Sequence, residues 1–181
     1  MRVELHTLSA ADREDFVEAM ARSRSFHGAW ISAPTTAAEF DALLRRTEDE
    51  SFVSLVIRLR EDGRLAGVFN ISEIVRRAFQ SAYIGYGAVA GLEGRGYMTE
   101  GMRLVLAHAF GELGLHRLEA NIQPANTASI ALVRRCGFVR EGFSENYLKI
   151  DGAWRDHERW AIRAELWEAL LDVPMPGEPA Q

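Results

Sequence analysis

A glycine-rich turn that runs directly into an amphipathic helix constrains this chain more than any other segment. Residues 93–96 (Glu-Gly-Arg-Gly) follow an apolar, strand-like stretch, and Met102, Leu106 and Ala109 then recur on one helical face. The beginning of a helix exposes unpaired N–H groups and the positive end of the helix dipole, so it attracts anions. Glycines let the backbone approach such a ligand closely, and Arg95 adds positive charge. The turn therefore predicts a phosphate or pyrophosphate site.

Hydrophobic periodicity predicts the elements on either side of this turn. We expect strands at 2–8, 51–60, 65–74, 81–90, 115–123, 143–150 and 153–162. Helices are expected after Asp12, after Thr35 or Thr36, after the glycine turn, after Asn126, and over 164–171. Gly114 should end the helix after the turn, and Gly85 and Gly87 suggest a bulge or a close backbone approach. The order predicts an α/β fold with a mixed, mostly antiparallel sheet and helices on both faces.

Bulk composition places the chain among ordinary globular proteins. Its 181 residues suit one domain, 1–171, followed by a Pro- and Gly-rich tail, 172–181, that we expect to be mobile. The net charge of −5 argues against a nucleic-acid partner, and no apolar run is long enough for a membrane span. A single cysteine, Cys136, indicates a reducing compartment, so we expect a cytoplasmic protein. The scattered histidines suggest no metal site.

The glycine turn alone leaves several ligands open. A P-loop is excluded because the Gly-x4-Gly-Lys-Ser/Thr spacing is missing. A dinucleotide site would need a third glycine, where this chain has Thr99, although Glu119 lies roughly where a ribose-binding acid would. A plain strand-to-helix turn without a ligand is the remaining alternative.

Three segments, the glycine turn among them, carry a family resemblance. Residues 93–98 resemble motif A of the GCN5-related N-acetyltransferases (GNAT), and 126–138, which end in Cys-Gly-Phe, resemble their motif B. The stretch Tyr-Leu-Lys-Ile-Asp-Gly-Ala-Trp-Arg-Asp-His at 147–157 is similar to the RimJ/RimL branch, and especially to its RimJ side. The resemblance covers about residues 3–167 and implies a GNAT-like acyl-CoA N-acyltransferase fold.

The resemblance implies that acetyl-CoA binds in a gap between two splayed strands. The pyrophosphate would lie on the amides of 94–99, and the backbone near Ala88 and Val89 would pair with the pantetheine arm. The implied cofactor-binding residues are Ala88, Val89, Glu93, Gly94, Arg95, Gly96, Tyr97, Met98, Thr99, Asn121, Asn126, Ser129 and Arg134.

The catalytic residues implied by the resemblance depart from the commonest pattern. Many relatives carry a tyrosine that protonates the departing thiolate where this chain has Val133, so Ser129 and Asn126 are assigned to thiolate stabilisation. Glu119 is the first candidate for the general base, followed by Asp156 and Glu73. Tyr147, Trp154 and Asp156 are expected to bind the acceptor.

The resemblance implies an acetyl-CoA-dependent N-acetyltransferase that acts on the N-terminal α-amine of a protein or peptide. The alternatives are an acetyltransferase for small amines and a catalytically silent module that binds CoA or a partner. Whether the chain forms a homodimer stays open.

Overall fold

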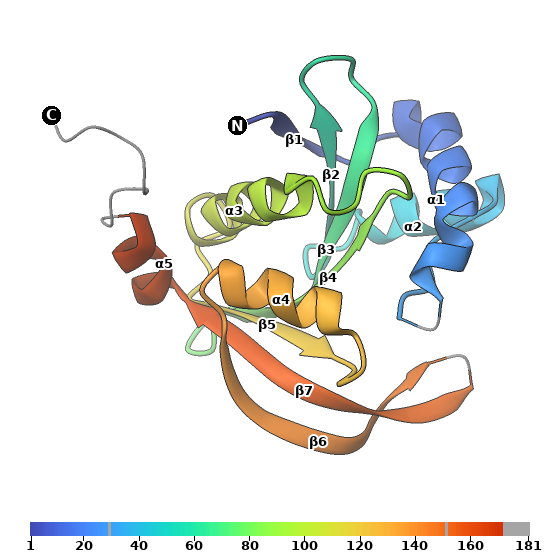
Figure 1. Cartoon of the computed structure of the whole chain (residues 1–181). Coiled ribbons are helices and arrows are strands. Elements are labelled where there is room, and N and C mark those ends of the chain that lie inside the picture. Colours follow the sequence, from blue (N-terminus) through green and yellow to red (C-terminus); the bar gives the residue numbers. More distant parts are fainter. Residues whose placement is uncertain (29, 151, 172–181) are drawn as a thin grey trace, which may run out of the picture.

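A seven-stranded sheet forms the centre of the molecule (Figure 1). The computed structural model describes residues 1–28, 30–150 and 152–171. The strands follow the order β1-β2-β3-β4-β5-β7-β6, and every neighbouring pair is antiparallel except β4 and β5. The predicted mixed, mostly antiparallel sheet is therefore confirmed. The strands are β1 (Val3–Thr7), β2 (Val53–Leu59), β3 (Leu65–Val75), β4 (Ser81–Ala88), β5 (Arg117–Ile122), β6 (Val139–Ile150) and β7 (Ala153–Arg163).

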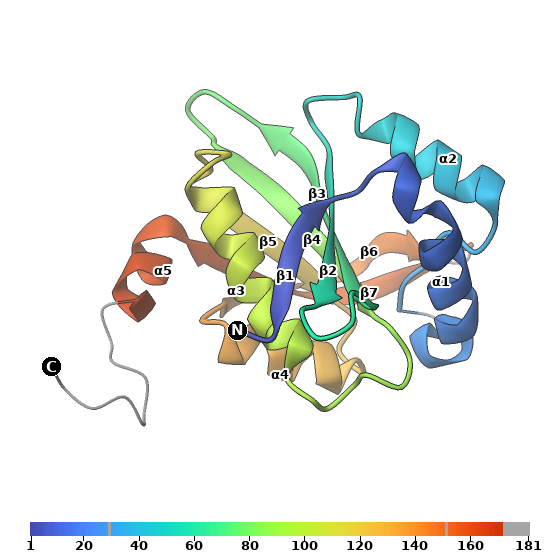
Figure 2. The same ribbon diagram turned by 90° about the horizontal axis from the view of Figure 1, so that it is seen from above.

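Helices cover both faces of this sheet, as predicted (Figure 2). One face carries the first two α-helices, and the opposite face carries the third and fourth. A short 3-10 helix precedes the first, and the last helix follows β7 directly. In chain order these are η1 (Ala10–Asp12), α1 (Arg13–His27), α2 (Ala37–Arg46), α3 (Tyr97–Phe110), α4 (Thr127–Arg135) and α5 (Ala164–Leu171).

Each face of the sheet has its own hydrophobic core. Met102 and Leu106 of α3 are fully buried against the sheet on one side. On the other side Phe16 of α1 and Phe40 of α2 meet edge to face, with ring centroids 5.2 Å apart. Each fully buried side chain of this size contributes roughly 1.5–3 kcal/mol. The two cores hold the sheet rigidly between the helical layers.

The β4–β5 pair gives the fold its functional feature, because the two strands separate along their length. Parallel pairing runs only from Ser81 opposite Arg117 to Tyr83 opposite Glu119. Helix α3 makes the crossover that a parallel pair requires. Beyond Tyr83, β4 continues along β3 while β5 continues along β7, so a gap opens between them.

Several predicted boundaries are corrected by the structure. Helix α3 ends at Phe110, where the amide of Gly111 caps the last turn, and Gly114 lies beyond it in the connection with a φ of 60°. Strand β6 begins at Val139, earlier than predicted, because it pairs with Ala161 there. Helix α4 connects β5 to β6, but β7 lies between these two strands in the sheet, so they do not pair with each other.

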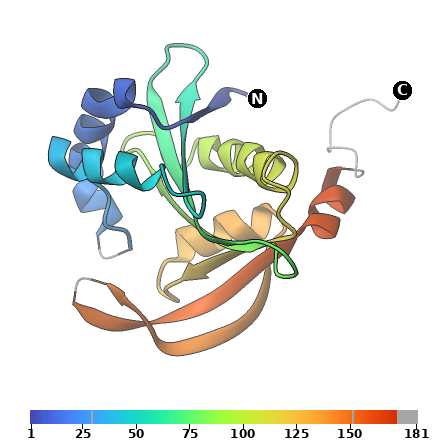
Figure 3. The same ribbon diagram turned by 180° about the vertical axis from the view of Figure 1, so that it is seen from behind.

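The paired strands β6 and β7 form a long curved hairpin at one end of the molecule (Figure 3). Residue 151, between the strands predicted at 143–150 and 153–162, and the predicted tail, 172–181, lie outside the described residues.

Candidate active site

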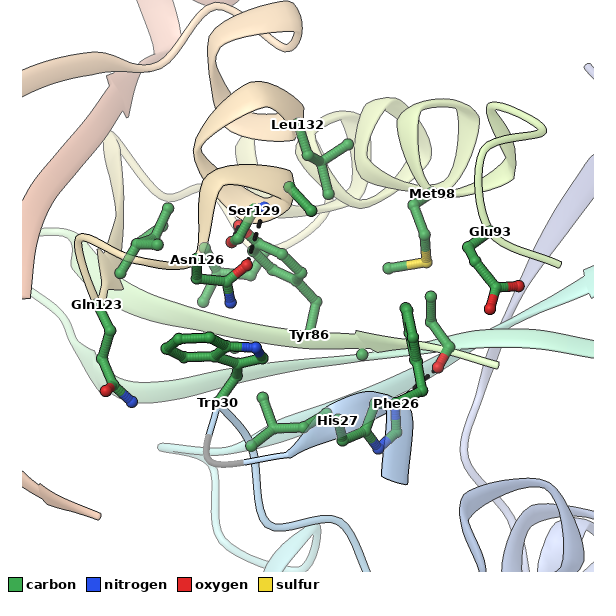
Figure 4. Close-up of a pocket in the computed structure, with 18 of the residues that line it drawn as sticks. Phe26, His27, Trp30, Tyr86, Glu93, Met98, Gln123, Asn126, Ser129 and Leu132 are labelled. Carbon is green, nitrogen blue, oxygen red and sulfur yellow. Dashed lines mark hydrogen bonds between the residues drawn. The ribbon is translucent and has the colours of Figure 1, made fainter. Parts of the chain in front are cut away.

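A cavity of about 610 Å³ occupies the gap between β4 and β5. Residues 84–88 of β4 and 120–122 of β5 form its walls, which are the segments beyond the last β4–β5 pair. Figure 4 places Glu93 and Met98 at one end and Trp30 and Gln123 at the other. Tyr86 and Ser129 lie between these two ends. The separated strands therefore form a channel, and the hydroxyl groups of Tyr86 and Ser129 lie along it.

The glycine turn forms one end of this cavity. Gly94 and Gly96 line it and have φ values of 74° and 85°, which only glycine adopts without strain. Gly96 is the N-cap of α3, so the amides of Tyr97 and Met98 belong to the first turn, where an α-helix offers no acceptor of its own. This end of the cavity therefore has the predicted features of an anion site.

Arg2 holds the glycine turn from outside. Its guanidinium donates to the carbonyl oxygen of Arg95 at 2.8 Å and to the Glu100 carboxylate at 2.7 Å, and it stacks 4.7 Å from the centre of the Tyr97 ring. Burial alone would raise the pKa of Glu100, but the hydrogen bonds from Arg2 outweigh it and lower that pKa. The side chain of Arg95 does not line the cavity; its carbonyl is part of this contact.

The backbone at Ala88 and Val89 was predicted to pair with the pantetheine arm, but much of it already hydrogen-bonds to other parts of the protein. His27 Nε2 lies 2.7 Å from the Ala88 carbonyl and donates to it, because a carbonyl oxygen can only accept. The amide of Val89 donates to Ala66, and Val89 is buried outside the cavity lining. A Cβ at Gly87 would meet the end of the Ile31 side chain at 2.4 Å, whereas nothing lies within 4 Å of a Cβ at Gly85. Both glycines pair with β3 in regular register, so the bulge suggested there is not found.

The two residues predicted to stabilise the thiolate lie together at the start of α4. The Asn126 side chain caps the helix, accepting from the Ser129 amide at 3.1 Å. The Ser129 hydroxyl lies 2.6 Å from the hydroxyl of Tyr86, a residue that sequence reasoning missed. Figure 4 shows Tyr86 pointing from β4 toward Ser129.

Asn121 contributes an unsatisfied polar group to the wall of the cavity. Its Oδ1 atom is buried and has no hydrogen-bond partner in the described part of the chain. A buried acceptor without a partner costs about 1–3 kcal/mol, so a ligand or a water molecule in the cavity is expected to donate to it.

Comparison with known proteins identifies the family. Residues 2–139 match the family model described as "Acetyltransferase (GNAT) domain". The chain belongs to the GNAT family of acetyltransferases. Members of this family transfer the acetyl group of acetyl-CoA to an amine. The positive-φ glycines, the open helix start, the splayed strands and the unpaired Asn121 oxygen all fit this co-substrate.

Individual relatives agree with the GNAT assignment. The probable N-acetyltransferase YjcK of Bacillus subtilis is 40% identical over 124 residues, which are 68% of this chain and 67% of that protein. The [ribosomal protein uS5]-alanine N-acetyltransferase of Escherichia coli is 36% identical over 107 residues, 59% of this chain and 55% of that protein. The chain thus spans little more than half the length of the E. coli relative.

A solved GNAT structure extends the similarity to the whole fold. RimJ of Mycobacterium smegmatis, solved in complex with CoA-disulfide, superposes with a TM-score of 0.83 at 28% identity. The match covers 93% of this chain and 88% of that one. The predicted GNAT fold and the resemblance to RimJ are therefore confirmed.

One predicted cofactor-binding residue lies one helical position away from the arginine that lines the cavity. Arg135, rather than Arg134, lines the GNAT cavity. Positions three or four apart share a helical face, and Arg135 continues the face of Ala128 and Leu132. Arg134 instead stacks on Trp160, with its guanidinium carbon 5.1 Å from the ring centre.

The carboxylates predicted as general bases lie outside the cavity lining. Glu119 stands opposite Tyr83 in the last β4–β5 pair, before the gap opens, and its carboxylate accepts from Arg117 at 2.8 Å. Asp156 accepts from the amide of Asn146 at 2.8 Å. Glu73 lies in the irregular part of β3 with a φ of 51°. Glu119 therefore lies outside the cavity in which the predicted base would act.

The predicted acceptor residues on the β6–β7 hairpin also lie away from the cavity. Tyr147 meets His157 edge to face at 6.1 Å and hydrogen-bonds to Tyr83, a bond that is the main cause of raising the pKa of Tyr83 to about 12. Trp154 is 60% exposed. Side chains alternate along a strand, so Leu148 and Ile150 of β6 face the cavity in place of Tyr147.

Another part of the cavity wall comes from a segment to which sequence reasoning assigned no function. Phe26, Trp30 and Ile31, at and after the end of α1, line the cavity. Their aromatic and aliphatic character was visible in the sequence, but no pattern linked them to residues more than 50 positions away.

Two classes of feature are not found in the part of the chain that the structure describes. No group of three or more His, Cys, Asp or Glu side chains is arranged to hold a metal ion. No helix there has the length and apolar character needed to cross a membrane.

Proposed function

We propose that this GNAT enzyme transfers the acetyl group of acetyl-CoA to the N-terminal α-amine of a protein or peptide. The observation that carries the proposal is the composition of the cavity beyond Tyr86 and Ser129. Trp30, Ile31 and Leu148 make that end largely apolar. Among the described residues that line the cavity, the only carboxylate is Glu93, and it lies at the opposite end, beside the glycine turn.

This composition favours an acceptor that needs neither a counter-ion nor a strong base. An α-amine with a pKa of ~7.8 is neutral in roughly a tenth of molecules at pH 7. A lysine or polyamine nitrogen, with a pKa of ~10.4, is neutral in fewer than about a thousandth. Such cationic amines are usually held by carboxylates, and none of the described residues that line the acceptor end carries one. The E. coli relative that is named for alanine N-acetylation of a ribosomal protein supports the same acceptor class.

In this proposal the phosphate groups of acetyl-CoA lie against the amides of residues 94–99, with Arg135 contributing positive charge. Asn121 accepts a hydrogen bond from the pantetheine arm or from the incoming amine. Ser129 donates to the thioester sulfur, and Asn126 supports it from the helix cap. The neutral α-amine enters from the end lined by Trp30 and Leu148.

A single peptide tests the acceptor class. It carries a free N-terminal alanine and one internal lysine, and its matched control has the same sequence with the α-amine blocked. After incubation with acetyl-CoA, mass spectrometry should place one acetyl group on the α-amine and leave the control unmodified. The rate at low peptide concentration should rise with pH around the pKa of the α-amine, because the acceptor itself is the titrating group.

Acetylation of the lysine in both peptides would contradict the proposal. So would acetylation of a small aliphatic diamine with neither peptide modified, which would place the enzyme among the small-amine acetyltransferases. Binding of acetyl-CoA without transfer to any amine would identify a silent CoA-binding module instead.

A further inference from the structure

A tyrosine hydroxyl reaches the middle of the cavity from the strand side. Tyr86 lies on β4, three residues beyond the last pair with β5, and its ring packs 5.9 Å from that of Phe69. Its hydroxyl ends 2.6 Å from Ser129 on α4, on the opposite side of the gap. Where many GNAT relatives carry a tyrosine on α4, Val133 is fully buried in the core and has no polar atom. The tyrosine hydroxyl that α4 lacks is therefore present, but it comes from β4.

Either hydroxyl of the pair could donate, and the phenol is favoured as the donor because it is more acidic than the aliphatic hydroxyl of serine. Burial raises the pKa of Tyr86 above its ordinary value of ~10, so its hydroxyl keeps its hydrogen at any working pH. When Tyr86 donates to the Ser129 oxygen, the hydrogen of Ser129 is free to point to another acceptor. Hydrogen bonds arranged in series polarise one another, so the outer hydroxyl becomes a stronger donor.

The position of the pair matches the place where a strong donor is needed. It lies between the anion site at Gly94 and Gly96 and the apolar end at Trp30. The thioester that joins the phosphate-bearing arm to the acetyl group has to pass between these two ends. When it breaks, negative charge develops on sulfur, and a preorganised donor stabilises that charge.

We propose that Tyr86 is a positioning residue for the leaving thiolate: it donates to Ser129, and Ser129 in turn donates to the CoA sulfur. The inference rests on the proposed acetyl transfer, not on the choice of acceptor. The amine nitrogen forms a bond to the carbonyl carbon, the carbon–sulfur bond breaks, and its electron pair goes to sulfur. The amine releases one proton and the thiolate takes up one, so both hydroxyl groups end as they began.

The thiol of bound CoA reports this contact directly, without any acceptor. The ultraviolet absorbance of the thiolate follows the titration of the thiol. In the wild-type complex the pKa of the CoA thiol should lie below the pKa of the same thiol in free CoA. Tyr86→Phe keeps the ring packing and should raise the pKa of the bound thiol by about one unit, a tenfold change in acid dissociation. Ser129→Ala should raise it at least as much.

The matched control is Tyr83→Phe, which removes a hydroxyl from the same strand but outside the cavity and should leave the pKa of the bound thiol unchanged. The double variant Tyr86→Phe/Ser129→Ala should not exceed Ser129→Ala, because Tyr86 acts through Ser129. In acetyl transfer, Tyr86→Phe should lower kcat about tenfold and leave KM for acetyl-CoA unchanged. Equal values of this pKa in the wild type and Tyr86→Phe, or additive shifts in the double variant, would overturn the proposal.

Discussion

Arg135 is the residue whose side chain most simply separates cofactor binding from stability. Within the described part of the chain it is the only arginine or lysine that lines the cavity, and acetyl-CoA is strongly anionic. Arg135→Ala should therefore raise KM for acetyl-CoA about tenfold, or ~1.4 kcal/mol, with little change in kcat. Steady-state kinetics at two salt concentrations would measure this, and the difference should shrink at high salt because charges are screened.

The neighbouring Arg134→Ala is the matched control. It removes the stacking on Trp160, so it should lower the free energy of unfolding while KM for acetyl-CoA stays near the wild-type value. An equal rise of KM in both variants would show that α4 presents a different face to the cofactor.

At the scale of elements, the connection from β4 to α3 is where backbone conformation limits function. Gly96→Val should greatly weaken acetyl-CoA binding, because a side chain at a φ of 85° strains the turn and its Cβ would lie 3.2 Å from the Arg2 guanidinium. Calorimetric titration measures the affinity. Gly63→Val is the control, since that hairpin glycine has a similar φ of 73° with open space around it. Gly63→Val should lower the stability of the fold without changing the affinity for acetyl-CoA. Equal affinities of the two variants for acetyl-CoA would contradict a phosphate-binding role for the turn at Gly96.

At the scale of the whole molecule, Arg58 ties the helical layer of α1 to the sheet. Its guanidinium on β2 donates to Asp12 at 2.7 Å and to Asp15 at 2.6 Å. Burial raises the pKa of Asp12, but hydrogen bonds from Arg58 and Ser9 outweigh it, so the pKa in the folded protein lies below its usual value. The charged form therefore stabilises the fold above a pH of ~4, and this contribution is lost as pH falls through the lower, folded-state pKa.

Asp12→Asn should accordingly lower the urea midpoint at pH 7, and its difference from the wild type should narrow below a pH of ~4. Glu14→Gln, an exposed carboxylate on the same helical layer, should change the midpoint little at either pH. A difference between Asp12→Asn and wild type that stays constant down to a pH of ~3 would contradict this account of the ion pair.

Local signals predicted the glycine turn and the helix start at one end of the cavity, and they missed Tyr86 at its centre. Gly94, Gly96 and the helix cap at Asn126 act through their own backbone, so their roles are visible in a few consecutive residues. Tyr86 acquires its role from Ser129, 43 residues later, through a contact that exists only once α4 packs over the gap. No periodicity carries that information.

The positions of Glu119, Arg134 and Tyr147 relative to the cavity could not be predicted for a related reason. Glu119 lies on the predicted strand. The point at which the gap between β4 and β5 opens depends on how far the two strands pair, and Glu119 belongs to their last pair. Arg134 and Tyr147 each missed by one position, because the face that a helix or strand turns to a cavity depends on packing. The order of β7 and β6 likewise follows from the long hairpin rather than from any local pattern.

The identity of the acceptor amine distinguishes a protein N-terminal acetyltransferase from a small-amine acetyltransferase. The decisive measurement incubates the purified protein with acetyl-labelled CoA and a cell extract separated into ribosomes, other proteins and small metabolites. Label should appear on protein α-amino termini, located by peptide mapping, and it should disappear with the Gly96→Val variant. Label confined to small amines, or to lysine side chains, would contradict the account.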